Sequence, residues 1–255
     1  MCELYFDLKF QMGKNISALK EFKSHGAEPF GNTDGWGIGF VSADGDMTLT
    51  RGLKQASLDP TWPTEPEGNT KITTSHIREA SEGGVVLENC QPFVRQLGRT
   101  RVVFAHNGEC PGLETSPEFK TCAFSPVGTT DSEVSFALLL GRLADINCKD
   151  PRLVLTILLD FARDMAERGP ANLIVSVGEW HFIFADVRKP VGEDSLQEPG
   201  LYLKRSESQL LAYSEPLQSG CVPVARGAWY FADAQSVLQH GTLKLDDRTL
   251  EFSKA

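Results

Sequence analysis

The second residue of the chain, Cys2, is a candidate nucleophile that can carry its own base. Removal of Met1 would leave a thiol and a free α-amine on one residue. A cysteine attacks as its thiolate, so it needs a base within hydrogen-bond reach or a lowered pKa. The α-amine of an N-terminal residue titrates at roughly 7.7 to 8.0 and can take the thiol proton directly or through one water. While Met1 is present, the same nitrogen is an amide and this base is missing.

Position alone also allows a plainer interpretation of Cys2, as a small, buried side chain at the start of a strand. The choice between the two interpretations depends on what the rest of the chain places near it. Four short segments carry polar groups at the edge of an apolar element, which is where active sites are commonly built. These segments are residues 31–37, 75–80, 104–109 and 128–133.

Two charged residues in these segments suit the two ends of a free amino acid. Arg78 follows a predicted strand, and its planar guanidinium can hold a carboxylate by two parallel hydrogen bonds. Asp131 stands at the start of a predicted long helix, where its carboxylate can bind a substrate ammonium. The commoner alternatives are a surface ion pair for Arg78 and an N-cap for Asp131.

Asn107 and Gly108 follow a strand that we expect to be buried. A side-chain amide and a glycine N–H are donors that can converge where a carbonyl oxygen becomes negative, although a plain Asn-Gly turn is the alternative. Each of these residues has a structural explanation when it is taken singly. Together with Cys2 they describe a site for cutting the side-chain amide of a free α-amino acid, which is glutamine.

The composition limits the classes of partner. The 255-residue chain is 41% hydrophobic and 23% charged, and its formal net charge is −9. These proportions predict one globular domain over residues 1–255, and the charge argues against nucleic acid or an anionic membrane as the main partner. The six cysteines form no C-x-x-C pair and no cluster of zinc-site spacing, so we expect reduced thiols. We find no apolar run typical of a signal peptide or a membrane span, and we expect a cytoplasmic protein.

Hydrophobic periodicity predicts the elements that position these residues. Strands are predicted at residues 4–10, 36–41, 47–51, 71–77 and 101–106, then at 173–177, 181–185, 201–204, 210–213 and 229–231, with a final pair around Asp246 and Asp247. Two long helices are predicted at residues 131–146 and 151–168, and Asn15 is expected to cap a short one. Asp44 and Gly45 predict a hairpin, and residues 54–70 a loop. Strands on either side of a helix pair predict two packed sheets covered by helices, an α+β fold.

As a set, the motifs resemble the class II glutamine amidotransferases, and the stand-alone YafJ-type subgroup in particular. The similarity rests on residues 1–4, 34–38, 76–78, 87–89 with 92–93, 105–108 and 130–133, which keep the order and spacing of the family. The motifs cover roughly the first half of the chain. The rest is similar more loosely, through its run of helices and strands.

This resemblance implies the N-terminal-nucleophile hydrolase fold, a four-layer αββα sandwich of two stacked, mainly antiparallel sheets. It implies that Cys2 attacks the glutamine amide with its own α-amine as base, and that Asn107 and Gly108 stabilise the oxyanions. Arg78 would then bind the α-carboxylate of the substrate and Asp131 its α-ammonium. The resemblance implies no metal and no cofactor.

His76 lies on the strand that leads to Arg78, and we include it among the residues of the substrate site. Because the α-amine already fills the role of base, we expect His76 and His106 to be ordered side chains that hydrogen-bond to backbone. Residues 81–84 predict a loop that covers bound glutamine.

The fate of the ammonia leaves several functions open. Members of this family normally pass ammonia to a synthase or transferase domain, and we expect the chain to hold the glutaminase alone. Either a partner subunit accepts the ammonia, or the protein simply hydrolyses glutamine or a γ-glutamyl peptide. If Met1 is retained, a catalytically silent glutamine sensor is the alternative. A redox or scaffold protein with functional thiols is a further one.

Overall fold

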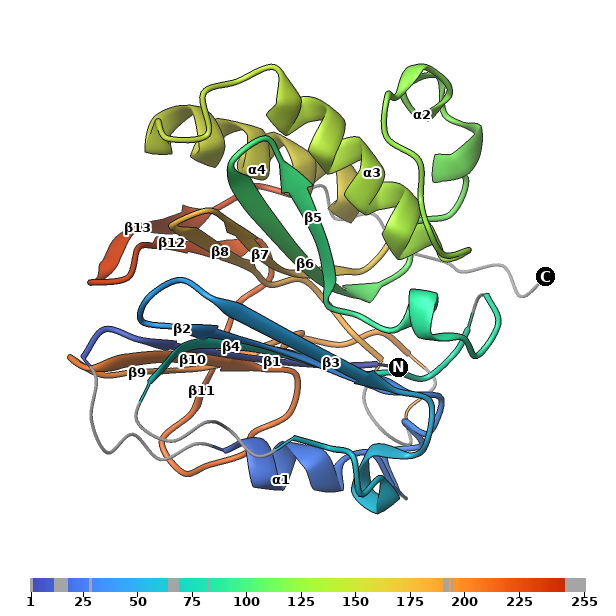
Figure 1. Ribbon diagram of the computed structural model, residues 1–255, viewed down its shortest axis with the longest axis vertical. Coiled ribbons are helices and arrows are strands. Elements are labelled where there is room, and N and C mark those ends of the chain that lie inside the picture. The colour runs from blue at the N-terminus through green and yellow to red at the C-terminus, as the bar shows by residue number, and fades with distance from the viewer. Residues whose placement is uncertain are drawn as a thin grey trace.

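Two antiparallel β-sheets are stacked face to face with helices on both outer faces, as the computed structural model shows (Figure 1). The structure describes residues 2–11, 18–27, 29–63, 69–81, 83–189, 193 and 195–245. The long helices α3 (Asp131–Ala144) and α4 (Pro151–Ala166) cover one sheet, and the short helix α1 (Leu19–Ser24) covers the other. The predicted α+β class and its four-layer αββα sandwich are therefore confirmed.

The strand that follows Cys2, β1 (Glu3–Lys9), runs through the middle of the seven-stranded sheet. In spatial order this sheet contains β11 (Val222–Pro223), β9 (Tyr202–Arg205), β10 (Gln209–Tyr213), β1, β4 (Thr70–Ile77), β2 (Trp36–Ser42) and β3 (Met47–Gly52). Because β1 has a neighbour on each edge and a packed layer on each face, all seven of its residues are buried.

The strand that ends in Asn107 and Gly108, β6 (Thr100–Gly108), belongs to the six-stranded sheet. In spatial order that sheet contains β13 (Val237–Thr242), β12 (Ala228–Ala232), β8 (Trp180–Phe184), β7 (Ala171–Val177), β6 and β5 (Phe93–Leu97). The residues of β6 from Val102 to Asn107 are buried, which confirms the predicted burial of this strand on both faces.

Side chains alternate between layers along β1, as the two-residue period of a strand requires. Leu4 and Phe6 point into the core between the sheets, where they share a cluster with Ile174 of β7. Tyr5 points the other way and packs on Phe22 of α1, with ring centroids 5.4 Å apart. This alternation determines which side of the sheet each residue near Cys2 occupies.

Both long helices begin where the capping residues predict. The Thr130 side chain accepts a hydrogen bond from the Glu133 N–H at 3.2 Å and caps α3, and Asp150 caps α4 through the Arg152 N–H at 2.9 Å. Each helix ends two residues earlier than predicted. In the described part of the chain, no helix combines the length and the apolar character needed to cross a membrane.

The sequence prediction lacks the edge strand β5, the short helix α2 (Pro117–Thr121), the two-residue strand β11 and the outer strand β13. In β5 only the first residue, Phe93, is buried, so the strand is defined by its pairing with β6 and not by an apolar run of its own. The predicted cap at Asn15 and the predicted pair around Asp246 and Asp247 lie outside the described residues.

Two buried histidines face the core between the sheets, His76 on β4 and His181 on β8. Burial lowers the pKa of His181 from 6.5 to about 4, a nearby Asp233 carboxylate opposes this, and Lys71 adds to it. The imidazole therefore stays neutral in the folded protein where the unfolded chain would bind a proton. This part of the stability is complete above pH 6.5 and is lost progressively as the pH falls toward the folded-state pKa.

We predict that His181→Gln weakens this acid sensitivity. Between about pH 7.5 and about pH 5, the loss in free energy of unfolding should be smaller than in the wild type by about 2 kcal/mol. Urea unfolding at the two pH values measures the difference. The matched control is His240→Gln, the same substitution at an exposed position on β13. Equal acid losses in wild type and His181→Gln would contradict the prediction.

Candidate active site

Cys2 lies directly before β1, and the backbone of Glu79 holds its thiol. The Cys2 Sγ–H donates to the Glu79 carbonyl at 3.2 Å, and the Glu79 N–H donates to Sγ at 3.3 Å. Burial raises the pKa of the Cys2 thiol to about 11, outweighing the opposite effect of the nearby Arg78 charge. The thiol is therefore protonated at neutral pH, and attack requires a base that removes its proton.

Arg78 follows the last residue of β4, and the segment around Asp34 fixes its backbone. The Arg78 N–H donates to the Gly35 carbonyl at 2.8 Å, and the Asp34 N–H donates to the Arg78 carbonyl at 3.0 Å. Its guanidinium is buried and donates to the carbonyls of Gly84 and Gly83 at 3.2 and 3.3 Å. The guanidinium N–H groups that could bind a carboxylate thus donate to two backbone oxygens of the loop after β4.

Asn107 and Gly108 lie at the end of β6, in the opposite sheet. A Cβ at Gly108 would lie 1.7 Å from the Pro170 carbonyl oxygen, so only glycine fits there. The Asn107 carbonyl accepts a hydrogen bond from the Asn172 side chain at 3.2 Å, and the Asn107 Nδ2 donates to Ser214 Oγ at 3.3 Å. Both the backbone and the side chain of Asn107 are therefore held by specific partners.

Asp131 is the first residue of α3, and it is not the N-cap that its position suggested. Thr130 adopts the extended backbone conformation and caps the helix, one residue earlier. The Asp131 carboxylate accepts hydrogen bonds from the Cys110 and Ser132 N–H groups, each at 2.6 Å. Both oxygens of this carboxylate are therefore engaged by backbone N–H groups.

The two histidines beside Cys2 differ in their partners. His106 is hydrogen-bonded at both ring nitrogens, to Ser132 Oγ at 3.0 Å and to the Pro170 carbonyl at 3.4 Å, as expected of an ordered side chain. Neither ring nitrogen of His76 has a hydrogen-bond partner among the described residues, so the expected backbone contact is wrong for His76. Burial lowers the pKa of both, that of His76 to about 3, with the Arg78 charge adding to the effect there. Both rings are weak bases.

One small pocket brings together five of the six predicted site residues. It is lined by Cys2, His76, Arg78, Glu79, Ser81, Asn89, Gln91, His106, Gly108, Thr130, Asp131 and Ser132. The sixth, Asn107, precedes Gly108, and its side chain reaches across to Ser214. The pocket volume is about 30 Å³.

Three polar residues that are not among the six predicted site residues support the pocket. Asn89 Nδ2 donates to the Gly84 carbonyl and its Oδ1 accepts from the Thr129 N–H, both at 2.8 Å, so it ties the loop after β4 to the start of α3. The Gln91 side chain accepts the His106 N–H at 2.6 Å. Ser214 is distant in sequence and reaches the site only through the pairing of β10 with β1.

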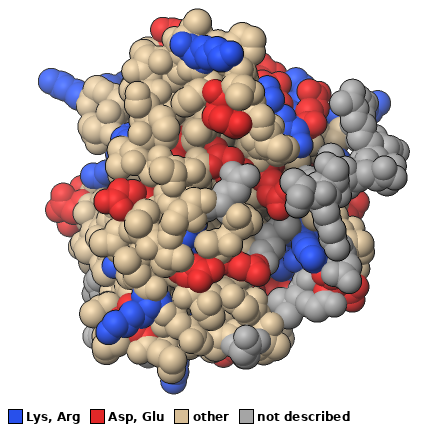
Figure 2. Space-filling view, turned by 90° about the vertical axis from the view of Figure 1, so that its right-hand side faces the viewer, with Lys and Arg blue, Asp and Glu red and all other residues tan. Residues whose placement is uncertain are grey.

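The face of the molecule that carries the N-terminal end of β1 is shown in Figure 2. Asp and Glu side chains lie across the middle of this face, whereas most Lys and Arg side chains lie nearer its edges. In the part of the face that the structure describes, no broad basic patch is present. This agrees with the formal net charge of −9.

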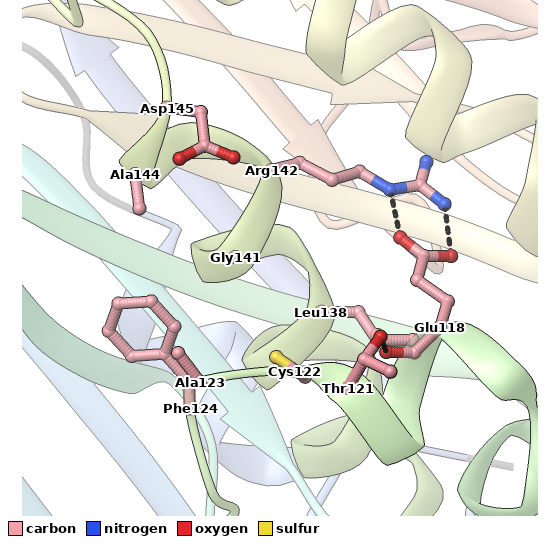
Figure 3. Close-up of a pocket in the computed structure, with 10 residues that line it drawn as sticks. All are labelled: Glu118, Thr121, Cys122, Ala123, Phe124, Leu138, Gly141, Arg142, Ala144 and Asp145. Carbon is pink, nitrogen blue, oxygen red and sulfur yellow. Dashed lines mark hydrogen bonds and ion pairs between the residues drawn. The ribbon is translucent and has the colours of Figure 1, made fainter.

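A larger hollow of about 330 Å³ lies away from Cys2, beside α2 and α3 (Figure 3). Its lining residues are Glu118, Thr121, Cys122, Ala123, Phe124, Leu138, Gly141, Arg142, Ala144 and Asp145. The Arg142 guanidinium already donates two hydrogen bonds of 2.8 Å to Glu118 and contacts Asp164 at 2.7 Å. Because this cation is already paired with two carboxylates, we place the candidate chemistry in the Cys2 pocket.

Comparison with known proteins agrees with the fold. The Escherichia coli protein YafJ, which is named as a glutamine amidotransferase, is 31% identical over 163 residues, covering 58% of each chain. A crystal structure of a Pseudomonas aeruginosa protein, titled a predicted glutamine amidotransferase, covers 93% of this chain and 95% of its own, with a TM-score of 0.56 and 23% identity. The Bacillus subtilis glutamine phosphoribosylpyrophosphate amidotransferase covers 96% of this chain with 50% of its own, with a TM-score of 0.66 and 15% identity.

The two stacked sheets with helices on both outer faces form the same layered fold as these solved amidotransferase structures. The family described as class II glutamine amidotransferases matches residues 1–196, and the chain belongs to this family. Members of this family act on the carbon–nitrogen bond of the glutamine amide. The chain spans about half the length of the curated relatives it matches.

We predict slow chemistry at Cys2 in a chain that retains Met1. A pKa of about 11 in place of 9.0 lowers the thiolate fraction at pH 7 by about 100-fold. Alkylation of Cys2 by iodoacetamide should therefore be about 100-fold slower than alkylation of a free cysteine peptide, and should accelerate about tenfold per pH unit until near that pKa. Mass spectrometry of the N-terminal peptide measures the rate. Labelling as fast as the peptide at pH 7 would contradict the prediction.

Proposed function

We propose that this chain is an amidohydrolase that cleaves the side-chain amide of glutamine or of another γ-glutamyl compound, with Cys2 as the nucleophile. The observation that carries the proposal is the pocket that joins the Cys2 thiol to Arg78, Gly108 and Asp131 from both sheets and from α3. Those groups match the parts of a γ-glutamyl substrate: the amide carbon, the carboxylate, the developing oxyanion and the ammonium. Membership of the amidotransferase family supports the same chemistry.

The reaction proceeds in two halves through a thioester. The α-amine of Cys2 takes the thiol proton, and the thiolate attacks the amide carbon. The tetrahedral oxyanion accepts hydrogen bonds from Asn107 Nδ2 and the Gly108 N–H. The protonated amine then gives its proton to the departing nitrogen, which releases ammonia and leaves a γ-glutamyl thioester. Water attacks the thioester through a second oxyanion, and glutamate and the free thiol are released.

The choice of the α-amine as base follows from the protonation properties of the pocket. A general base works best when its pKa lies near the working pH. The pKa of His76, lowered to about 3, makes its imidazole a far weaker base than the N-terminal amine of roughly 7.7 to 8.0. Removal of Met1 is therefore part of the proposal, because it creates this amine.

Arg78 and Asp131 are proposed to bind the α-carboxylate and α-ammonium of the substrate. The Arg78 guanidinium now donates to the neutral carbonyls of Gly83 and Gly84. A carboxylate is the stronger acceptor, since charge-assisted hydrogen bonds are roughly twice as strong as neutral ones. Substrate entry would exchange these partners and release the loop. His76, whose ring nitrogens have no hydrogen-bond partner among the described residues, contributes a polar wall for the bound substrate or water.

The acceptor of the ammonia is a separate question. A synthase or transferase partner subunit is one proposed acceptor, because the chain belongs to the amidotransferase family and is similar to an amidophosphoribosyltransferase. Direct hydrolysis of glutamine or a γ-glutamyl peptide needs no acceptor. A catalytically silent glutamine sensor would still bind the substrate through Arg78 and Asp131 but would leave its amide intact.

The test is ammonia or amine release by protein without Met1. Glutamine, γ-glutamyl peptides and asparagine are compared, and we expect release from at least one γ-glutamyl substrate and much less from asparagine. Cys2→Ala should abolish release, whereas Cys148→Ala, at another free and half-buried cysteine, should not. Glutamine binding without turnover would favour the sensor. Wild type no faster than Cys2→Ala on every substrate would disprove the hydrolase.

We predict that Arg78→Lys raises KM about tenfold or more with a smaller effect on kcat. A single ammonium cannot reproduce two parallel hydrogen bonds to a carboxylate, and 1.4 kcal/mol corresponds to about tenfold in affinity. Steady-state kinetics measure both constants. Arg163→Lys on α4, an exposed arginine paired with Asp160, is the matched control and should change neither. An unchanged KM in Arg78→Lys would remove Arg78 from the substrate site.

A further inference from the structure

The Asn107 amide is held at one end and unpaired at the other. Its Nδ2 donates to Ser214 Oγ at 3.3 Å, while Oδ1 is buried and has no hydrogen-bond partner among the described residues. The residue is completely buried. A buried acceptor left without a donor is costly, so this arrangement needs an explanation.

The hydrogen bonds of Ser214 explain why Asn107 Oδ1 has no donor. Ser214 directly follows β10, is completely buried, and its Oγ accepts the Leu4 N–H at 2.9 Å. The Ser214 N–H also donates to the Leu4 carbonyl at 3.1 Å, so the two residues bind each other in both directions. A hydroxyl has two lone pairs and one proton. With Leu4 and Asn107 both donating to Oγ, the hydroxyl proton has no acceptor among the described residues.

A half-turn of the Asn107 amide satisfies both orphaned groups at once. The oxygen and nitrogen ends of an amide are nearly equal in shape, so the rotation leaves the outline of the side chain unchanged. Ser214 Oγ–H then donates to Asn107 Oδ1, and Oγ still accepts from the Leu4 N–H. The Nδ2 group takes the end of the amide that has no partner among the described residues.

We propose that Ser214 is a positioning residue that orients the Asn107 amide so that Nδ2 serves the oxyanion. This rests on the proposed amide hydrolysis, because only that function gives the free end an oxyanion to bind. The hydrogen-bond chain runs from the Leu4 N–H through Ser214 to Asn107. It joins β1, which follows Cys2, to β6, which contains Asn107, although β1 and β6 lie in opposite sheets.

Asn172 completes this arrangement from the other side of Asn107. Its Nδ2 donates to the Asn107 carbonyl at 3.2 Å, and its Oδ1 accepts the Asp186 N–H at 2.9 Å. The second contact identifies the oxygen end of Asn172, so its orientation is fixed. The Asn107 backbone is thus held by Asn172 and its side chain by Ser214. A donor held in this way needs no rearrangement when charge develops on the substrate.

A double-mutant cycle with Ser214→Ala and Asn107→Ala tests the proposal. Asn107→Ala should lower kcat by ~10²–10³, as loss of one oxyanion donor typically does. Ser214→Ala should lower kcat by about 10- to 100-fold through misplacement of that donor, with KM little changed because Arg78 and Asp131 are untouched. The double variant should be no slower than Asn107→Ala alone, since Ser214 acts through Asn107.

The matched control is Ser75→Ala on β4. Ser75 is also completely buried in the seven-stranded sheet, but its Oγ donates to the Gly37 carbonyl at 2.8 Å and does not contact Asn107. Any fold-decrease in kcat that Ser75→Ala causes should multiply with the fold-decrease that Asn107→Ala causes. Unfolding curves of all variants identify losses that come from instability. If Ser214→Ala leaves kcat unchanged, or lowers it equally in both backgrounds, the positioning role is wrong.

Nuclear magnetic resonance can determine the orientation of the Asn107 side-chain amide without any enzymatic turnover. In the proposed orientation the Asn107 Nδ2 protons point away from Ser214, so we expect no strong nuclear Overhauser effect between them and the Ser214 Hβ protons. A strong effect would overturn the proposal whether or not the enzyme is active. If the wild type releases no ammonia or amine but gives the expected spectrum, the proposed function is wrong. The proposed orientation of the Asn107 amide is then still supported.

Discussion

The site depends on the pairing of β1 with a neighbour on each side in the middle of the seven-stranded sheet. On one side Glu3 is opposite Ile77, which brings Cys2 to the backbone around Arg78. On the other side Tyr5 is opposite Tyr213, which brings Ser214 to Leu4. A slip of one residue would turn every side chain of β1 to the opposite face. The buried alternation along β1 therefore secures the position of the nucleophile.

A second feature of the site is that its charged and polar groups are occupied before substrate arrives. Arg78 binds the loop carbonyls of Gly83 and Gly84, and Asp131 accepts two backbone N–H groups. The Cys2 thiol is bound to Glu79 and its pKa is raised by burial. These contacts hold the groups that line a pocket of about 30 Å³, in which the thiol is protonated at neutral pH. In the proposed function, a ligand with both a carboxylate and an ammonium would exchange these partners.

Much of the fold was predictable because its main elements carry strong local signals. The hairpin at Asp44 and Gly45 joins β2 and β3, and the two long helices begin at their predicted residues. The elements that were not predicted form through pairing or packing with neighbouring elements. Phe93 is the only buried residue of β5, so that strand exists because β6 offers an edge to pair with. The N-cap moved from Asp131 to Thr130 because both residues can cap, and only the backbone conformation decides between them.

The sequence by itself determined the family and the candidate chemistry, because residue types such as Cys2, Arg78 and Asp131 stand in motifs whose order is a property of the chain alone. Only the tertiary structure decided how these groups are held. The unpaired nitrogens of His76 and the link from Ser214 to Asn107 have no local signature. Ser214 is separated from Leu4 by 210 positions, and their hydrogen bond exists because β10 pairs with β1. Orientation and protonation depend on burial and on partners from other strands, and those arise only when the two sheets pack together.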